Sequence, residues 1–345
     1  MKTIQKLVVI VLVLLFYFKE GRAQEFYVDA INGLDSNDGS PDNPFKSIPQ
    51  SVKVANELTG SGDILIRVMP GYYVLEDKTS INPVRIFNDT SRFIIEAFYN
   101  PDEEGWSPQQ MPVIQSISAN NSTTFFNHAV GILVASEHVS LRGLKFLGNA
   151  NPLVKYYYPI TKEDKDLRDL EVSQCMFIGD KEASRIQGGV WAHGMNNEVK
   201  NCVFYECRNA ILFFDNVAGF KISKSIIMES YESAFWFGPD DVDFEFSNNI
   251  VANNNNVIVG RSANLKYSSF FKESVIVNNN SIVGYWSGEK GEIVNIENPD
   301  IQFKNVIDKG FIEVYKNEED NFKANHLHLI QNSLGSVYKA GLFKK

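Results

Sequence analysis

The chain has 345 residues, with 33 Lys and Arg against 42 Asp and Glu, so its formal net charge is -9 at pH 7. An acidic surface argues against a nucleic-acid partner and against an anionic membrane face. Three cysteines are too few for a disulfide-rich scaffold.

Residues 1–23 have the features of a cleaved secretory signal. Two lysines precede an apolar run from Leu7 to Phe18, and Gly21-Arg22-Ala23 offers small residues at a cleavage site. The run is too short to span a bilayer comfortably, which disfavours the alternative of a retained anchor. We expect a secreted, periplasmic or cell-surface protein without stable membrane insertion. Cleavage would remove four basic residues and one acidic residue, leaving 29 - 41 = -12.

Residues 24–129 are expected to form an N-terminal cap and the first irregular coils. A strand at Phe26–Asp29 leads into a turn-rich loop, a short helix at Ser47–Leu58 and a strand at Ile64–Val68. A solenoid needs an atypical terminal unit over its open core, and one amphipathic helix would serve.

Residues 130–345 contain a short apolar segment that recurs roughly every 25 residues, the period of a solenoid. Within each copy the apolar residues alternate, which indicates a strand. Small or amide residues follow three positions later and are expected to hydrogen-bond from coil to coil, at Asn149, Asp180, Ser230, Asn254 and Asn279. The anchoring positions are Phe146, Phe177, Phe204, Ile227, Val251 and Ile276, with gaps of 31, 27, 23, 24 and 25.

A second set of strands lies between these anchors, at 131–136, 189–194, 210–215, 234–239, 256–261 and 281–286. Alternation predicts that residues such as Val190 and Ala192 point inward. In the last two strands it predicts inward Val257, Val259, Ile282 and Gly284. The fold class is therefore all-β, a right-handed parallel β-helix formed by one domain over 24–345. An antiparallel sandwich or a propeller is the competing all-β fold, but it does not predict this period.

Two of the three cysteines, Cys175 and Cys202, stand two residues before their anchors. We expect them to stack as reduced, buried residues, since a free cysteine packs as a small hydrophobe. A disulfide between them is the alternative.

The N-terminal segment carries a recognisable series of motifs. They are Tyr27-Val28, Asn32-Gly33-x-Asp35-x-x-Asp38-Gly39, Asn43-Pro44-Phe45-Lys46-Ser47-Ile48, Gly62-Asp63 and Pro70-Gly71-x-Tyr73. This order resembles the cap of pectate-lyase-like β-helix proteins of the pectin-lyase-like superfamily. The resemblance implies a polysaccharide groove over the second strand set. The superfamily includes lyases, hydrolases, epimerases and binding proteins, so the resemblance specifies a fold and not an activity.

Aromatic side chains are predicted on the outward face of the second strand set. They are Trp191, Phe214, Trp236 and Tyr285. Exposed, they would form a strip on which sugar rings stack and would bind substrate. Alternatively, long insertions such as 150–187 cover this face and bury them.

Polar residues cluster at the far ends of the same strands, and we take them as candidate catalytic residues. They are His193, Asp215, Asp240, Asp241 and Arg261. Adjacent carboxylates can divide into acid and base roles or bind Ca²⁺, and the histidine or arginine can protonate or neutralise a uronate. Ca²⁺ is the only cofactor that these residues suggest, and the metal site is unknown. The alternative is an ordinary solvated turn at 238–241.

Lyases of this superfamily commonly use a lysine or arginine as base, whereas its hydrolases use two or three aspartates on adjacent coils. The available bases are Arg185, Lys200, Arg208, Lys221, Lys224 and Lys266, and none is tied to the groove by its pattern. We expect a secreted, monomeric carbohydrate-active protein that acts on a polysaccharide as a lyase or glycoside hydrolase. The alternative is a non-catalytic glycan-binding or structural protein on the same scaffold.

Overall fold

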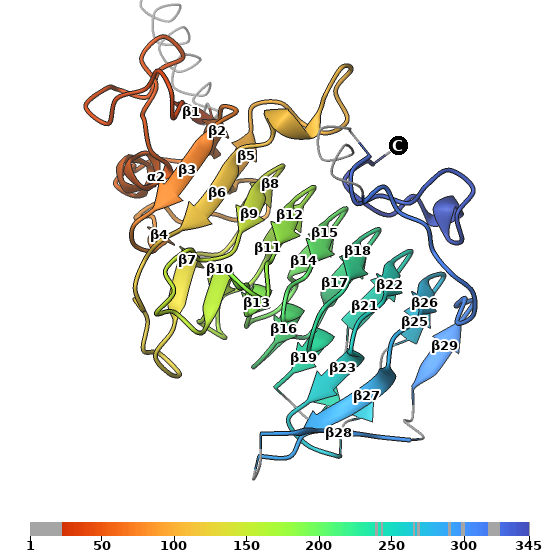
Figure 1. The fold of residues 1–345 in the computed structure, drawn as a ribbon. Coiled ribbons are helices and arrows are strands. Elements are labelled where there is room, and N and C mark those ends of the chain that lie inside the picture. The colour runs from red at the N-terminus through yellow and green to blue at the C-terminus, as the bar shows by residue number, and fades with distance from the viewer. Residues whose placement is uncertain are drawn as a thin grey trace, which may run out of the picture.

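The computed structural model describes residues 23–238, 241–242, 244–264, 266–267, 270–288, 291–297, 301–316 and 325–344. Short strands wind into coils that stack in chain order along one axis (Figure 1). Strands from successive coils pair in parallel and form three long sheets, which we name A, B and C. The predicted parallel β-helix is confirmed.

Each complete coil of the described chain contributes one strand to each sheet, whereas β1 and β29 extend sheet A at its two ends and β28 pairs antiparallel with β27. Sheet A contains β1 (Gln24–Val28), β2 (Ile64–Val68), β5 (Phe93–Ala97), β8 (Val139–Arg142), β11 (Leu170–Ser173), β14 (Glu198–Lys200), β17 (Phe220–Ser223), β21 (Phe244–Ser247), β25 (Phe270–Lys272) and β29 (Gln302–Lys304). Sheet B contains β3 (Tyr72–Leu75), β6 (Val113–Ser116), β9 (Lys145–Leu147), β12 (Met176–Ile178), β15 (Val203–Tyr205), β18 (Ile226–Met228), β22 (Ile250–Ala252) and β26 (Val275–Val277). Sheet C contains β4 (Thr79–Ile81), β7 (Ala129–Val134), β10 (Tyr157–Lys162), β13 (Gly188–Ala192), β16 (Asn209–Phe213), β19 (Ser233–Phe237), β23 (Asn256–Gly260), β27 (Ser281–Trp286) and β28 (Ile293–Asn295). β20 (Asp241–Val242) and β24 (Lys266–Tyr267) pair separately.

The predicted anchors lie in sheet B and pair with one another in register. Phe146 pairs with Phe177, Phe177 with Phe204, and the series continues through Ile227, Val251 and Ile276. The first three form a buried stack, with ring centroids 5.1 and 4.5 Å apart. Because each coil touches only its neighbours, this stacking provides the continuous core that no single coil has alone.

Polar ladders join the coils at two turns. Asn249 accepts a hydrogen bond from the backbone of Ser225 and donates to Ile222 O. At the other turn Asn254 accepts from the backbone of Ser230, and its own backbone N donates to Asn279 Oδ1. The predicted coil-to-coil bonds are thus confirmed for Ser230, Asn254 and Asn279. Asp180 instead caps its own turn, accepting from the backbone of residues 182 and 183.

The three cysteines are buried and unbridged. Cys175 and Cys202 belong to the same core cluster, and their thiols point at backbone carbonyls. The expectation of reduced, buried cysteines is confirmed.

The register of sheet C corrects two of our expectations. Phe235 pairs with Ile258 and Ile258 with Val283, so these residues face the core. The predicted inward positions were therefore wrong at Val259 and Gly284, which face outward. Val257 lies in the core cluster as predicted, and Ile282 packs against it.

The segment 150–187 is also not an insertion, because it contains β10, β11 and β12. β10 pairs with β7 on one side and β13 on the other, so it is a full member of sheet C. This strand is hard to predict from the sequence because it contains Pro159, and proline has no N–H group to donate a hydrogen bond within a sheet. Tyr158 and Ile160 on either side of Pro159 pair with Val130 and Ile132 of β7.

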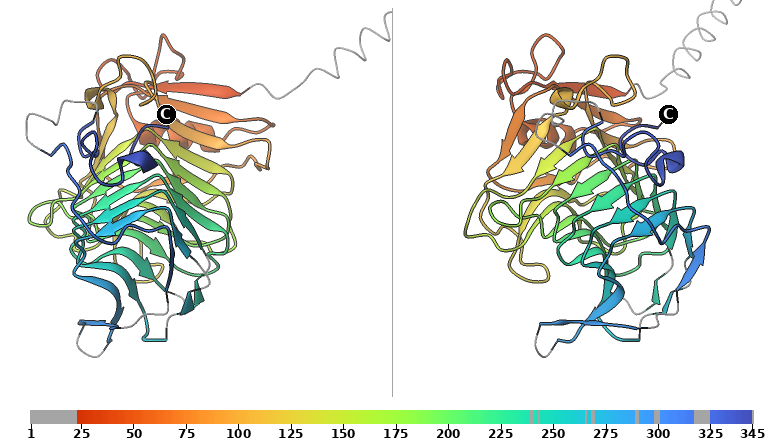
Figure 2. Two further views of the ribbon diagram at one scale, coloured as in Figure 1. Left: turned by 90° about the vertical axis from the view of Figure 1, so that its right-hand side faces the viewer. Right: turned by 45° about the vertical axis from the view of Figure 1, so that its right-hand side comes forward.

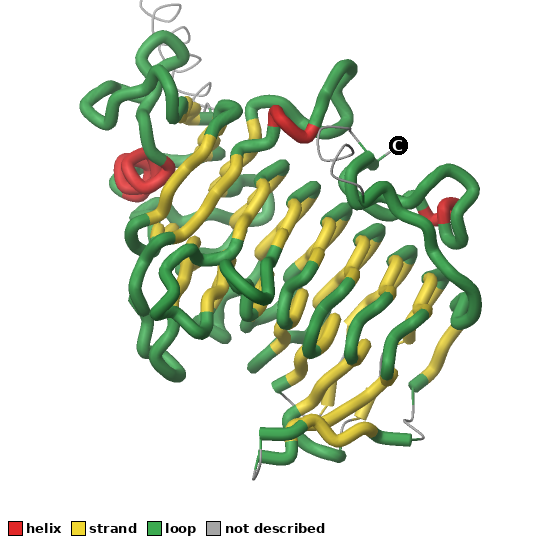
Figure 3. The backbone as a smooth tube through the Cα atoms, in the orientation of Figure 1, coloured by secondary structure: helices red, strands yellow, loops and turns green. Residues whose placement is uncertain are grey.

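The N-terminal cap contains the one α-helix of the described residues, α2 (Ile48–Asn56), as Figure 3 shows. Ser47 caps it by accepting from the backbone of Gln50, and Pro49 suits its first turn. Ile48, Val52 and Ala55 pack into the same core cluster as β1 and β2. Parallel pairing begins at β1, so the coils start well before residue 130.

The C-terminal segment returns along the coils toward the N-terminal end, as Figure 2 shows. Its Leu327 and Leu342 pack on the outer face of sheet B with Met176, Val203 and Ile226. Phe343 reaches Trp106, with ring centroids 5.7 Å apart. This segment covers sheet B and leaves the outward face of sheet C for a binding site. Within the described residues, none of the helices is both long and apolar enough to cross a membrane.

Candidate functional site

The outward face of sheet C carries an aromatic row, as predicted. Trp191 pairs with Leu212, and Leu212 with Trp236, in three successive coils. The next row along the strands contains Glu163, His193 and Phe214, since the backbone N of His193 donates to Lys162 O and that of Phe214 to Ala192 O.

Trp191 is buried, with 1% of its surface exposed. The covering segment is residues 119–128, which we name the cover loop, and not 150–187 as expected. Phe125 and Phe126 of this loop lie 5.3 and 5.9 Å from the Trp191 ring. Tyr158 packs on Trp191 from within the sheet at 4.5 Å. The prediction of an exposed strip is therefore wrong at Trp191.

Trp236 of the aromatic row and Phe214 of the next row form the accessible aromatic pair on this face. Their rings are stacked, with centroids 5.4 Å apart, and both are half-buried. Tyr285 does not join them, because it pairs with Gly260 in the row that faces the core. This placement corrects the predicted position of Tyr285. The exposed platform consists of Phe214 and Trp236.

His193 and Asp215 are brought together, as the sequence predicted. The backbone N of Asp215 donates to His193 Nδ1 at 3.2 Å, and the Asp215 carboxylate lies 3.9 Å from the same nitrogen. Phe125 stacks on the imidazole at 4.9 Å. Burial lowers the pKa of His193 to about 4, so the ring is a neutral acceptor at pH 7.

This histidine gives the fold a pH dependence. The unfolded chain binds the His193 proton near pH 6.5, whereas the folded chain binds it only near pH 4. Stability is therefore fully present above pH 6.5 and is lost as the pH falls toward 4, by about 3 kcal/mol for this residue.

Urea unfolding of wild type and His193→Asn at pH 7 and pH 4 measures the effect. We expect the variant to lose about 3 kcal/mol less than wild type over this range. Equal losses in both proteins would contradict the account. His328, whose pKa burial also lowers to about 4, remains in both and acts as an internal reference.

The remaining candidates are only partly placed. Asp240 lies outside the described residues, and for Asp241 the structure gives the backbone, which pairs with Lys266 in β20 and β24. Arg261 is exposed, and its backbone N donates to Phe237 O. The predicted assembly of all five polar residues therefore remains an expectation.

The cover loop is held by buried hydrogen bonds to Glu163. Glu163 Oε1 lies 3.2 Å from His128 Nε2 and accepts from Ser122 Oγ at 2.9 Å, and the carboxylate also accepts from Thr124. Burial opposes ionisation of Glu163, but hydrogen bonds from His128, Thr124 and Ser122 outweigh it and lower its pKa to about 2. The loop is thus fastened to the sheet by a charged residue in the same row as His193.

Removing both rings of the cover loop is expected to expose Trp191. In the double variant Phe125→Ala and Phe126→Ala, acrylamide should quench the tryptophan fluorescence more strongly and the emission should shift to longer wavelength. Phe311→Ala is the matched control, because Phe311 is 80% exposed and away from this face. Unchanged quenching in the double variant would show that the loop does not shield Trp191.

A cavity lies at the opposite ends of the sheet C strands, and we name it the sheet C pocket. Its volume is about 420 Å³, within the range of ligand pockets. The lining residues are Lys155, Arg185, Gln187, Arg208, Tyr231, Glu232, Asn255, Asn256 and Ile293. Three cations face one carboxylate, so the pocket is locally basic on an acidic chain.

Arg208 is the best-fixed of these cations. Its Nε and Nη2 lie 2.6 and 2.5 Å from Glu232 Oε2, and its Nη1 donates to Gln187 Oε1 at 3.2 Å. Asn209 Nδ2 donates to the other oxygen of Glu232. Arg185 and Lys155 are exposed at the rim, so their charges are available to an anionic ligand.

The pattern of the sequence did not place these residues, although a signal was present. The residue just before each of four successive sheet C strands, β13, β16, β19 and β23, is polar: Gln187, Arg208, Glu232 and Asn255. From the sequence, Arg185 and Arg208 are only two of the available bases, and no pattern ties them to the groove.

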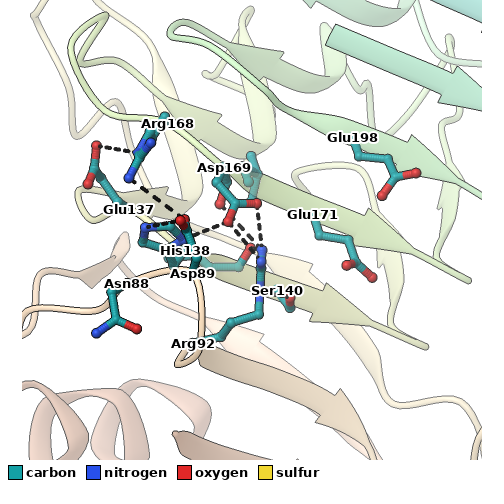
Figure 4. A network of polar contacts seen from close by, with 12 residues as sticks. Asn88, Asp89, Arg92, Glu137, His138, Ser140, Arg168, Asp169, Glu171 and Glu198 are labelled. Atoms are coloured by element: carbon teal, nitrogen blue, oxygen red, sulfur yellow. Dashed lines mark hydrogen bonds and ion pairs between the residues drawn. The ribbon is translucent and has the colours of Figure 1, made fainter. Parts of the chain in front are cut away.

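A second polar cluster lies at the corner between sheets C and A (Figure 4). Asp169 accepts from both terminal nitrogens of Arg92, at 2.8 and 2.9 Å, and lies 2.6 Å from His138 Nδ1. His138 Nε2 faces Asp89 at 3.9 Å. The cluster joins three successive coils, and we assign it to stability because every strong contact is internal.

Among the described residues, no group of three His, Cys, Asp or Glu side chains is arranged to hold a metal ion. Asp240 and the side chain of Asp241 are outside that set, so the expectation of Ca²⁺ stays a prediction.

No family model matches the chain, and no curated protein matches it by sequence. Solved structures do resemble it. A rhamnogalacturonan lyase has a TM-score of 0.51 at 13% identity, over 82% of this chain and 73% of its own. The pectin methylesterase from Aspergillus niger has a TM-score of 0.50 at 9% identity, over 93% and 95%. Pectate lyase Pel9A has a TM-score of 0.48 at 15% identity, over 83% and 77%.

The protein therefore has the pectin-lyase-like β-helix fold, as the cap motifs implied. At these identities the likeness establishes the fold alone, and the activity has to be argued from the site.

Proposed function

We propose that this protein is a secreted, carbohydrate-active β-helix protein that acts on an anionic polysaccharide at the outward face of sheet C. The single observation that carries the proposal is the sheet C pocket, where Lys155, Arg185 and Arg208 surround one carboxylate, Glu232. The protein as a whole is acidic, so these cations form the local basic patch that a polyanionic chain requires.

The neighbouring aromatic pair supports the same reading. Phe214 and Trp236 belong to the same sheet, toward the other ends of its strands, and offer flat, half-buried rings. A sugar ring stacks on such a platform through its C–H face, while carboxylates of adjacent sugars pair with the arginines. Backbone amides and Asn255 at the rim supply further donors to hydroxyl groups.

Cleavage by β-elimination is the enzymatic form of the proposal. It needs a base that takes the proton from the carbon next to the uronate carboxylate while the glycosidic oxygen leaves from the neighbouring carbon. The pocket groups that can accept a proton are the Glu232 carboxylate and the Lys155 amine in its neutral form, and the remaining cations would neutralise the uronate. Hydrolysis would need two carboxylates flanking the bond, whereas Glu232 is the one carboxylate among the described residues that line the pocket. The named relatives include lyases and an esterase acting on pectic material.

Binding without cleavage is the second candidate, and one observation favours it. Arg208 is held by Glu232 through two short contacts and so remains a paired cation. A paired guanidinium binds a carboxylate well but is a poor base.

The mature protein should be incubated with polygalacturonate, alginate, hyaluronan and neutral glycans, with and without Ca²⁺. Unsaturated uronate in the product indicates elimination, and new reducing ends without unsaturation indicate hydrolysis. Binding of an anionic glycan with neither product supports the non-catalytic candidate. If none of the anionic glycans binds or is cleaved, the proposal is wrong.

A further inference from the structure

A second cavity lies at the N-terminal end of the molecule and shares no lining residue with the sheet C pocket. We name it the cap pocket, and its volume is about 530 Å³. Its lining residues are Ala30, Asp35, Lys46, Ser47, Ile48, Pro49, Tyr72, Tyr73, Val74, Glu76, Asp77 and Lys78. They come from the cap loop, the start of α2, the strand β3 and the turn after it.

The floor of the cap pocket is an exposed apolar surface. Tyr72 and Val74 are outward residues of β3 and are 51% and 42% exposed. The Tyr72 hydroxyl donates to the Gln115 side chain of the next coil, which fixes the ring in place. The returning C-terminal segment packs on later strands of sheet B and leaves β3 open. Tyr72 and Val74 thus give the cavity an accessible apolar floor with polar groups around it, which is the usual make-up of a ligand pocket.

The rim of the cap pocket is polar, and some of its side chains are bonded to the protein while others are exposed to a ligand. Asp35 is a structural brace, because its carboxylate accepts from the backbone of Lys46 and Ser47 and from Ser47 Oγ. Lys78 Nζ donates to Asn121 O. Within the described chain, the side chains of Glu76 and Lys46 are exposed and make none of the hydrogen bonds or ion pairs that the structure shows.

The two pockets differ in charge. The cap pocket has three carboxylates against two lysines, so its formal charge is 2 - 3 = -1. The sheet C pocket has three cations against one carboxylate, 3 - 1 = +2. A polyanion is therefore repelled from the cap pocket, whereas hydroxyl groups can donate to Glu76 and Asp77 and accept from Lys46.

We infer that the cap pocket is a second glycan site, one that binds an uncharged oligosaccharide. The Tyr72 ring stacks on the C–H face of a pyranose, and Glu76 and Lys46 bond its hydroxyls. The site acts by binding alone and does not depend on the proposed function of the sheet C pocket.

The test titrates the mature full chain with cellohexaose, xylohexaose and β-1,4-galactohexaose in a calorimeter. We expect at least one to bind wild type, and Tyr72→Ala to weaken that binding about tenfold or more. Glu76→Gln should weaken it severalfold. Phe311→Ala removes an exposed aromatic ring that does not line the cap pocket, and it should leave the affinity unchanged. Thermal unfolding of each variant confirms that the fold is intact, and Glu76→Gln tests the site if Tyr72→Ala is unstable.

The two sites are separable by variants. Arg208→Ala should not affect neutral-glycan binding, and Tyr72→Ala should not affect binding of polygalacturonate. The inference is overturned if wild type binds none of the three neutral hexasaccharides, or if Tyr72→Ala and Glu76→Gln both bind as wild type does. If none of the anionic glycans binds or is cleaved while a neutral hexasaccharide still binds, the proposed function alone is contradicted.

Discussion

Phe204→Ala is expected to destabilise the protein by about 3–5 kcal/mol, the usual cost of removing a buried aromatic ring. Phe204 ends the stack that begins at Phe146 and Phe177, and it is fully buried. In a solenoid the cavity would lie between two coils, so the interface that transmits stability along the chain is weakened at that point. Urea unfolding followed by circular dichroism measures the change.

Phe303→Ala is the matched control. Phe303 packs 5.6 Å from Phe271 in the last coil but is half exposed, so its removal should cost less than about 1 kcal/mol. If the two variants were destabilised equally, the continuous core would not be the main source of stability.

Arg208→Ala is expected to weaken binding of anionic polysaccharide by about 10- to 100-fold, the value of one charge-assisted hydrogen-bonding group. Arg208 is the cation that Glu232 and Gln187 hold in a fixed position in the sheet C pocket. Its loss also removes the salt bridge from the largely buried Glu232 carboxylate. The formal charge of the pocket falls from 3 - 1 = +2 to 2 - 1 = +1, so the pocket attracts anions less strongly. Binding is measured by titration at low and high salt.

Arg142→Ala is the control, because Arg142 pairs with Glu96 on the outward face of sheet A in a similar way. It should retain wild-type affinity. Equal losses in Arg142→Ala and Arg208→Ala would mean that only the overall charge of the protein matters. If Arg208→Ala binds the polysaccharide as tightly as wild type does, the sheet C pocket is not the binding site.

The coil period and the core-facing anchors could be predicted from sequence because each coil repeats the same short alternating strand. The strands of sheet C were harder. A strand buried on both faces reads as a continuous apolar run, so Val257, Ile258 and Val259 give no alternation that identifies the inward residue. Val257 and Ile258 both lie in the core cluster. The inward–outward alternation therefore shifts by one residue between them, and the predicted inward position of Val259 was wrong.

The site could be predicted only in part. His193 and Asp215 meet because they end adjacent strands of sheet C, which the coil period places side by side. The cover loop could not be foreseen, because the reach of Phe125 and Phe126 over Trp191 depends on a loop that follows no period. The sheet C pocket needs residues from six separate segments, and only the folded coils bring Lys155, Arg185 and Arg208 together.

Hydrogen–deuterium exchange with and without an anionic oligosaccharide tests the central claim most directly. The account predicts slower exchange in peptides that cover residues 180–188, 206–210 and 230–233, which border the sheet C pocket. The exchange rate should not change in peptides that cover strands of sheet A, such as residues 198–200. If the oligosaccharide binds but slows exchange only in other parts of the molecule, or nowhere, polysaccharide binding cannot be assigned to sheet C.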